Sequence, residues 1–315
     1  MEKILLNGLA LAYHPISNQL ADWLWDDAEI RGFVKRSNLY MIAQREEIFF
    51  DGYGVDPSTN FLTFSLASRH RRIDNLSLDT DRFMHAWDGE AEWELGKQFF
   101  RLWSITDNKR EKVLRWFTVE KLLWEHSRGT VRVPNLKEYR DLMTFRLLYV
   151  GISKQGDSFS RLFAKGHEKR AKILSNESQL RDAARLTDEL FIFLFDVHQT
   201  RINSVDPAEK SEVMKELFEL SSPDKMRIVA DAEKAFVKIL NTKYNTLKYT
   251  NYPYGVDGLY NQGFDRYGYF VDEDITFQTE SALIRGGYAG TATRFTNPDL
   301  ILVEGDTVNL VKVED

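Results

Sequence analysis

The sequence predicts an α+β fold in which helices flank a small mixed sheet, with an α/β N-terminal domain and a β-rich C-terminal segment. Three observations lead to this prediction. In the middle of the chain, apolar runs of strand length alternate with segments of helical periodicity. All seven tryptophans lie between Trp23 and Trp124, whereas ten of the thirteen tyrosines lie from Tyr139 onward. From about residue 256, short alternating runs are separated by turn residues.

Composition restricts the class of protein. A chain of 315 residues can form more than one domain. It has no cysteine, which excludes disulfides, thiolate metal sites and cysteine catalysis and is typical of the cytoplasm. No segment approaches ~18 consecutive apolar residues, so we expect no membrane span. The net charge of −6 argues against a protein that merely coats nucleic acid, but it allows a nuclease with a local basic patch.

Basic runs at 31–36, 68–72 and 107–115 are candidates for such a patch. Each is either a solvated face or loop, as most charge runs are, or a contact for phosphate.

The change in aromatic usage predicts a domain boundary where the segment SRGTVRVPN (127–135) supplies Gly and Pro. We therefore expect a Trp-rich N-terminal domain over 1–135, a middle domain over 136–255 and a β-rich segment over 256–315. Within the first, apolar residues recur every three or four positions over 91–106 and 109–126, which predicts two helices.

In the middle domain, the apolar runs at 145–152 and 188–197 are expected to be strands of one sheet. Helices are expected against it over 158–174 and 223–241. In the tail, residues 299–313 are expected to form a hairpin around Glu-Gly-Asp.

Glu233 stands out on the helix predicted over 223–241. It falls within the apolar stripe that contains Val229, Phe236 and Leu240. A carboxylate in such a stripe is costly unless a cation or metal compensates it. It is therefore either half of a buried ion pair with an arginine, or a metal ligand or catalytic carboxylate at the floor of a cleft.

The predicted helix over 158–174 carries a basic face made by Arg161, Lys165, Lys169 and Lys172. This face is either solvated or follows a phosphate backbone, with Arg161 making the bidentate contact. His167 lies off that face on a continuous helix, and only a break at Gly166 would bring it to the same site.

Three further residues are candidates for a site. Tyr149, in the strand sequence YVG, is either an ordinary strand aromatic or a phenol that accepts a proton or positions a water. Gly151 would let backbone approach a ligand closely. Asn245 follows the long helix and is either a helix-stop residue or part of the site.

Over about 136–255 the chain resembles the GIY-YIG nuclease superfamily. YVG (149–151) stands where that family has its YIG strand, and Arg161 followed by His167 resembles its signature arginine region. DAEKAFVKILNTKYN (231–245) resembles its helix-borne glutamate, followed a dozen residues later by asparagine. No literal GIY precedes YVG, and Tyr139 would take the place of the first motif tyrosine.

The resemblance implies a metal-dependent phosphodiester hydrolase. Glu233 would hold one Mg²⁺ or Mn²⁺ ion and Arg161 would bind the phosphodiester. Tyr149, Tyr139 and His167 would assist proton transfer from water. Lys165, Lys169, Lys172 and Asn245 would support the site and contact nucleic acid.

The sequence thus leads to a hypothesis and two alternatives. The hypothesis is a cytoplasmic endonuclease acting on DNA rather than RNA, by analogy in restriction or anti-phage defence, with a homo-oligomeric or defence-system partner. The first alternative is an inactive nuclease fold that binds nucleic acid or protein. The second is a scaffold in which Glu233 and Arg161 form a buried ion pair.

Overall fold

The structure is a computed structural model. It separates into two compact units. Unit 1 comprises 1–44, 144–177 and 190–315, and unit 2 comprises 45–143 and 178–189. The residues that the structure describes are 2–56, 61–84, 87, 89–164, 166–204, 223–288 and 297–313.

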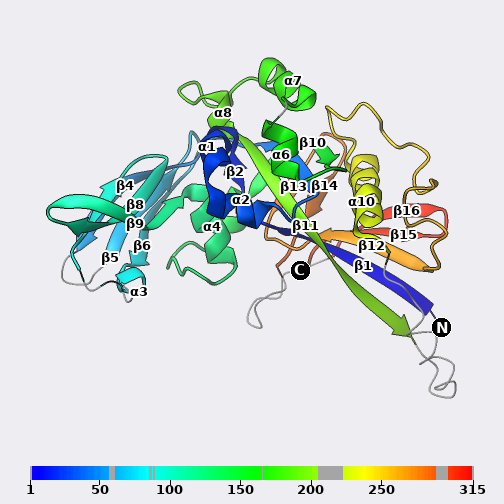
Figure 1. The fold of residues 1–315 in the computed structure, drawn as a ribbon, viewed down its shortest axis with the longest axis horizontal. Coiled ribbons are helices and arrows are strands. Elements are labelled where there is room, and N and C mark those ends of the chain that lie inside the picture. Colours follow the sequence, from blue (N-terminus) through cyan, green and yellow to red (C-terminus); the bar gives the residue numbers. More distant parts are fainter. Residues whose placement is uncertain are drawn as a thin grey trace. The chain divides into compact units, whose positions relative to one another are not determined.

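A large sheet dominates unit 1 (Figure 1). Its described strands follow the order β14-β13-β10-β3-β11-β1-β12-β15-β16, and β2 also pairs with β11. β3 is buried along its whole length, as expected for a central strand. The strands are β1 (Glu2–Leu11), β2 (Ile16–Ser17), β3 (Leu39–Gln44), β10 (Thr144–Ile152), β11 (Leu190–Ser204), β12 (Arg266–Val271), β13 (Thr276–Gln278), β14 (Leu283–Arg285), β15 (Leu300–Glu304) and β16 (Thr307–Val311).

The two ends of this sheet come together at Asp299. Its carboxylate accepts a hydrogen bond from the Arg285 backbone N–H at 2.7 Å and pairs with Lys312 at 2.8 Å. Its own N–H donates to the Arg285 carbonyl at 2.8 Å, and the Arg285 side chain reaches the Val313 carbonyl at 2.6 Å. Asp299 is fully buried, where an uncompensated charge would be costly. The hydrogen bond from Arg285 and the ion pair with Lys312 compensate that charge. The sheet is therefore nearly closed and barrel-like, which protects its edge strands.

The predicted fold class is wrong, because the protein is largely β and does not have a small sheet flanked by helices. The strands over 145–152 and 188–197 do share one sheet, as predicted, but β3 lies between them. The N-terminal and C-terminal strands then extend this sheet on β11 and on β10. The periodicity of a segment indicates that it is a strand but does not identify its partner, so sequence reasoning could not assemble this sheet.

The helix predicted over 158–174 is two helices, α6 and α7, because Gly166 between them adopts a φ of +65°. The helix predicted over 223–241 is α10, and its apolar face, including Val229 and Phe236, is buried. The predicted C-terminal hairpin is confirmed by the antiparallel pair β15 and β16. The helices of unit 1 are α1 (Asn18–Trp23), η1 (Leu24–Asp26), α2 (Ala28–Val34), α6 (Ser158–Phe163), α7 (Glu168–Asn176) and α10 (Lys225–Leu240).

Unit 2 contains two three-stranded antiparallel sheets, β4-β5-β6 and β7-β8-β9. Phenylalanine rings pack at its centre, with Phe50 and Phe100 at a centroid distance of 4.8 Å and Phe100 and Phe117 at 5.2 Å. Its elements are β4 (Phe49–Asp56), β5 (Phe61–Ala67), β6 (Arg72–Asp79), α3 (Asp81–Met84), β7 (Ala91–Leu95), β8 (Phe99–Thr106), β9 (Lys109–Thr118), α4 (Val119–Ser127), α5 (Tyr139–Leu142) and α8 (Leu186–Glu189).

The helices predicted over 91–106 and 109–126 are largely wrong. The first segment forms β7 and β8, and the second forms β9 followed by α4. Along β8 buried and less buried residues alternate, which is the period of a half-buried strand. Large apolar residues occur at many positions here, so they match a helical and a strand period alike.

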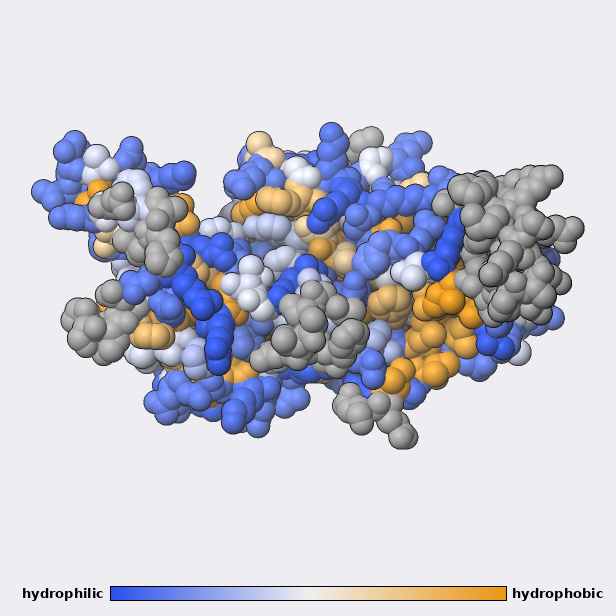
Figure 2. Space-filling model, turned by 90° about the horizontal axis from the view of Figure 1, so that it is seen from below, coloured by the Kyte–Doolittle hydropathy of each residue, from blue (hydrophilic) through white to orange (hydrophobic). Residues whose placement is uncertain are grey.

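The two units do not coincide with the boundaries expected at 135 and 255. The larger segment of unit 2, residues 45–143, is inserted between β3 and β10, two neighbouring strands of unit 1, and its smaller segment, 178–189, lies between α7 and β11 in the chain. Seen from below, the surface is mostly hydrophilic with separate apolar patches (Figure 2). Ile202 on β11 is one large apolar residue with a high exposure, at 47%.

Candidate active site

Two tyrosines stand side by side on adjacent strands of unit 1. Tyr40 on β3 lies opposite Gly151 on β10, and Tyr149 is two residues before that glycine. The ring centroids of Tyr40 and Tyr149 are 6.0 Å apart. A Cβ atom at Gly151 would lie 2.6 Å from the Tyr149 ring and 2.7 Å from the Tyr40 hydroxyl. The glycine of YVG therefore makes room for the two rings, whereas the sequence suggested that it makes room for a ligand.

His167 completes a hydrogen-bonded group with Tyr40. It is buried at the N-cap of α7, where its Nδ1 accepts the Arg170 backbone N–H at 3.0 Å. Because Nδ1 accepts, we assign the proton of the neutral ring to Nε2, which then donates to the Tyr40 hydroxyl at 2.7 Å. Burial lowers the pKa of His167 to about 4, and the neighbouring Arg161 and Arg170 charges add to this effect. His167 is thus a neutral donor at pH 7.

Both tyrosines hold their protons tightly. Burial raises the pKa of Tyr40 above its usual range, and its interactions with Tyr149 add to the rise. Burial also raises the pKa of Tyr149, and the Glu233 charge raises it further. Two effects oppose this at Tyr149, namely a hydrogen bond with Tyr40 and the charge of Arg161. Of the two phenols, Tyr149 is therefore the one whose ionised form is stabilised by a neighbouring hydroxyl as well as by the Arg161 charge.

Arg161 is available to bind an anion. It lies in the last turn of α6 and is exposed. Within the described part of the chain it forms no ion pair. Its charge lowers the pKa of Tyr40, Tyr149 and His167. The break at Gly166 is what lets α6 and α7 serve one site.

Glu233 is a desolvated carboxylate without a cation partner. It is partly buried on α10, and burial raises its pKa to about 7. Its hydrogen bond comes from the Tyr249 hydroxyl at a long 3.4 Å. No lysine or arginine among the described residues lies within ion-pair distance, although Lys154 and Lys234 lower its pKa from further away. Its charge acts on Tyr40 and Tyr149, so Glu233 belongs to the same group.

The fully buried carboxylate of α10 is Asp231, which the sequence analysis did not single out. It accepts hydrogen bonds from the hydroxyls of Tyr252 and Tyr269, the latter at 2.8 Å, and from the Leu259 backbone N–H at 2.6 Å. Burial raises the pKa of Asp231, and these hydrogen bonds, which lower it, offset only part of that rise. The prediction that Glu233 sits within the core stripe is thus wrong in detail: Asp231 is in the core with its partners, and Glu233 is at the rim without them.

Asn245 holds the strand that carries Tyr149. Its side-chain amide accepts the Val150 N–H at 3.0 Å and donates to the Val150 carbonyl at 2.8 Å. Thr242 donates to the same amide oxygen at 2.7 Å. Asn245 is buried by these contacts, so it fixes β10 in place rather than facing a nucleic acid directly.

A cleft of about 710 Å³ opens beside Glu233. Three lysines contribute to its wall, and among them Lys154 has no ion pair with a described residue. Lys234 pairs with Asp257, and Lys248 donates to a backbone carbonyl. The cleft is lined by three lysines and two carboxylates, Glu233 and Asp257, and Asp257 is already paired with Lys234. Such a lining suits a polyanion that approaches a metal ligand.

The structure places the other predicted residues differently. Tyr139 lies in α5 of unit 2, where it is buried with its ring 5.2 Å from that of His126. The tyrosine that lies beside Tyr149 is Tyr40 and not Tyr139. Lys169 donates to Thr246 at 3.0 Å, and Lys172 is exposed on α7. Lys165 lies outside the described residues.

The signal that could have found Tyr40 is weak. Its strand, LYMIAQ, is apolar like many core strands and precedes the YVG strand by the whole of the inserted unit. A search for a strand that pairs with YVG through a short hairpin turn reaches Tyr139, ten residues upstream, and does not extend as far as Tyr40.

Comparison of the chain with protein-family models, with curated proteins and with solved structures yields no match in any of the three. Among the described residues, no three or more His, Asp or Glu side chains come together as a metal-binding group. None of the helices in the described ranges is long and apolar enough to cross a membrane.

Proposed function

We propose that the protein is a divalent-metal-dependent nuclease that hydrolyses phosphodiester bonds, with its site in unit 1. The observation that carries this proposal is that the charges of an arginine and a glutamate, Arg161 and Glu233, both act on two neighbouring tyrosines, Tyr40 and Tyr149. Structural ion pairs bring opposite charges together, whereas neither Arg161 nor Glu233 forms an ion pair with a described residue. The resemblance to GIY-YIG nucleases draws its support from these side chains alone, because the observed fold contradicts the fold class that the resemblance implied.

Glu233 is suited to hold Mg²⁺ or Mn²⁺. A hard cation favours a carboxylate that is short of positive charge, and Mg²⁺ uses one or two protein carboxylates together with substrate phosphate and water. Burial and the raised pKa of about 7 mark Glu233 as such a ligand. When bound, a divalent cation would supply positive charge beside the phosphate and lower the pKa of a bound water.

The other side chains have separate roles. The Arg161 guanidinium would bind non-bridging oxygens of the phosphate through its planar fork. His167 is not the base, because Nδ1 accepts a backbone N–H and Nε2 carries the proton. It holds Tyr40 instead, and Tyr40 in turn supports the ionised form of Tyr149. We assign proton acceptance from the attacking water to the phenolate of Tyr149, which must first lose its own proton to solvent. A cation at Glu233 would favour this ionised form, because it would neutralise the Glu233 charge that helps to raise the pKa of Tyr149.

Cleavage of supercoiled DNA and of single-stranded RNA with Mg²⁺, with Mn²⁺ and with EDTA tests the proposal. We expect divalent-dependent cleavage that is abolished in Glu233→Ala and strongly reduced in Arg161→Ala. Arg161→Lys should restore little activity, because an ammonium group lacks the planar fork. Arg110→Ala, which removes an exposed arginine of unit 2, is the matched control.

The competing interpretation is a fold that binds nucleic acid without cutting it. It predicts binding by the wild-type protein that Arg161→Ala weakens, with no cleavage under any divalent ion. A wild type that neither binds nor cuts nucleic acid would leave Arg161 and Glu233 without the proposed roles.

A further inference from the structure

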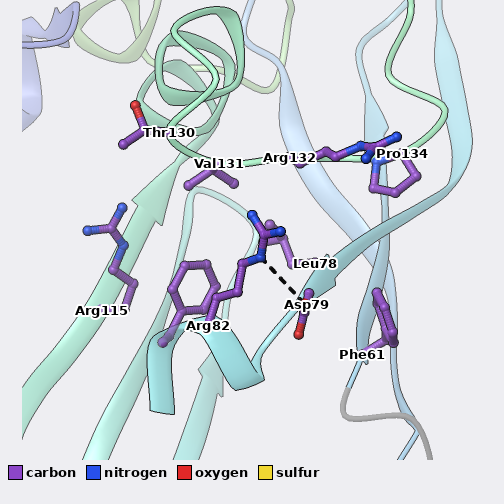
Figure 3. Close-up of a pocket in the computed structure, with 10 residues that line it drawn as sticks. Phe61, Leu78, Asp79, Arg82, Arg115, Thr130, Val131, Arg132 and Pro134 are labelled. Carbon is purple, nitrogen blue, oxygen red and sulfur yellow. Dashed lines mark ion pairs between the residues drawn. The ribbon is translucent and has the colours of Figure 1, made fainter. Parts of the chain in front are cut away.

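Unit 2 contains a pocket of its own, of about 430 Å³ (Figure 3). Its walls come from the start of β5, from the end of β6 with α3, from β9 and from the segment over 130–134. This volume is within the range of sites for small organic ligands. The residues that line the pocket are Phe61, Leu78, Asp79, Arg82, Phe83, Arg115, Thr130, Val131, Arg132 and Pro134.

Positive charge dominates this pocket, with three arginines against one aspartate. Figure 3 shows the guanidinium of Arg82 between those of Arg115 and Arg132. Arg82 contacts Asp79 only at 3.6 Å, and both side chains are largely exposed. Arg132 is exposed and has no ion pair within the described ranges. Two guanidinium forks are thus free or nearly free to bind an anion.

Arg115 has a different, structural role. It pairs with Glu125, and its guanidinium lies 5.5 Å from the Phe83 ring and 5.1 Å from that of Phe117. Its Nε is buried without a hydrogen-bond partner among the described residues. Arg115 therefore keeps the back of the pocket positive while it orders the Phe83 ring. Arg115 is the last residue of the basic run at 107–115. Its side chain lines this pocket, so this part of the run is neither a loop nor a solvated face.

The rest of the lining is apolar and partly aromatic. Phe61 and Phe83 are both partly exposed, and Leu78 of β6 completes the apolar part of the lining with Val131 and Pro134 of the 130–134 segment. An inorganic anion would leave these apolar surfaces without a partner. A ligand that carries both an anionic group and a flat apolar face uses both halves of the lining.

We propose that this pocket binds a nucleotide, with its phosphate on Arg82 and Arg132 and its base against Phe61 and Phe83. Arginine forks match phosphate oxygens, and every base presents a π-face for stacking on an aromatic ring. The nucleotide is either free or one unit of a nucleic-acid strand, since both present the same chemistry. This site is separate from the nuclease site of unit 1 and does not depend on it.

Isothermal titration in EDTA tests this proposal without interference from metal-dependent cleavage. The probes are dAMP, dTMP, thymidine, inorganic phosphate and 5′-phosphorylated hexathymidylate. We expect dAMP and dTMP to bind at least about tenfold more tightly than phosphate or thymidine, because each of the latter keeps only half of the contacts. Tighter binding of the hexanucleotide than of dTMP assigns the pocket to a strand, and the opposite order assigns it to a free nucleotide.

Two sets of variants locate the binding. Arg82→Ala with Arg132→Ala should weaken dAMP binding by at least about tenfold, and Lys at both positions should recover little of it. Both side chains are exposed, so the fold should survive, which a thermal melt verifies. Phe61→Leu should weaken dAMP binding and leave phosphate binding unchanged. Arg110→Ala, on the same unit but outside the pocket, should change neither.

Three outcomes overturn the proposal. They are the absence of nucleotide binding at about 5 mM, equal binding of dAMP and phosphate, and dAMP binding that survives the double arginine substitution.

Discussion

Two carboxylates two residues apart on α10 show how residue environment separates structure from function. Asp231 is surrounded by three donors, whereas Glu233 has one distant hydroxyl. Each is costly to bury, and only the first is compensated within the described chain. Substitutions that remove the charge should therefore act in opposite directions at the two positions.

Glu233→Gln should stabilise the metal-free protein at high pH. Unfolded glutamate titrates near ~4.3, and the folded group near about 7. The unfolded chain thus loses its proton first, so this group lowers stability as pH rises between the two values, by up to about 4 kcal/mol. The variant should match the wild type near pH 4, as urea unfolding in EDTA would measure, and exceed it at pH 8.

Asp231→Asn is the matched control for this experiment. An amide nitrogen would face a donor at one of the three hydrogen bonds, so the variant should lose about 2 kcal/mol or more at both pH values. A loss of about 3–5 kcal/mol in Glu233→Gln at pH 8 would show that Glu233 is instead half of a structural ion pair.

Tyr40→Phe should lower cleavage by a factor of about 10²–10⁴, because it removes the hydroxyl that supports the ionised form of Tyr149. It also leaves the Nε2–H of His167 without its acceptor, which should cost about 1–3 kcal/mol of stability. Single-turnover cleavage and thermal melting measure the two effects.

Tyr139→Phe is the natural comparison, since it removes the same atom from the tyrosine that the sequence favoured. It should cleave like the wild type. If Tyr139→Phe were the inactive variant and Tyr40→Phe the active one, the site would have to be reassigned to Tyr139.

At the scale of elements, the break between α6 and α7 decides whether the basic helix contributes to a site. Gly166 lies in the left-handed region with a φ of +65°, and Gly156 in the loop before α6 has a φ of +73°. A Cβ atom would meet no neighbouring atom at either glycine. Both positions therefore require a left-handed backbone conformation. Only Gly166 lies between Arg161 and His167, so only its conformation determines how these two side chains are placed relative to each other.

Gly166→Ala and Gly156→Ala should each cost about 1–2 kcal/mol, the penalty for a side chain in this conformation. Only Gly166→Ala should also lower cleavage at a temperature where both variants are folded, because a straighter chain moves His167 away from Tyr40. Thermal melts and cleavage rates at that temperature compare them. Equal cleavage by the two variants would remove the functional role of the break.

Elements also show where sequence reasoning succeeded and where it could not. Tyr149, Arg161, His167 and Glu233 could be proposed from the sequence because each depends on local features, namely a strand, a basic helix and a charge near an apolar stripe; their role in a site stays a prediction. Tyr40 was missed because its place beside Tyr149 is fixed by pairing between strands that a whole unit separates. For the same reason single strands such as β10 and β11 were predicted, but the large sheet was not.

At the scale of the whole molecule, the larger segment of unit 2, residues 45–143, is inserted between two paired strands, so it can in principle be removed while 178–189 remains. The register places Gln44 opposite Arg146. A two-residue Asn-Gly turn that joins Glu46 to Thr144 would continue this ladder as an ordinary hairpin.

The chain with 47–143 replaced by Asn-Gly should fold, melt in one transition and retain divalent-dependent cleavage within about tenfold of the wild type, because every proposed catalytic residue remains. It should no longer bind dAMP in EDTA. The same deletion with Glu233→Ala is the inactive control. A folded deletion variant without cleavage would assign unit 2 an essential part in the reaction.

The place of β1 in the sheet has a consequence for synthesis on the ribosome. Residues 2–11 emerge early, but their neighbours on either side are β11, near residue 200, and β12, which ends at residue 271. At ~5–20 residues per second, β1 waits roughly ten seconds to a minute for both partners. Its apolar edge is open during that interval and can pair with other nascent chains. β1 therefore precedes the other strands of this sheet in synthesis, yet both of its edges are paired only after β12 has been made.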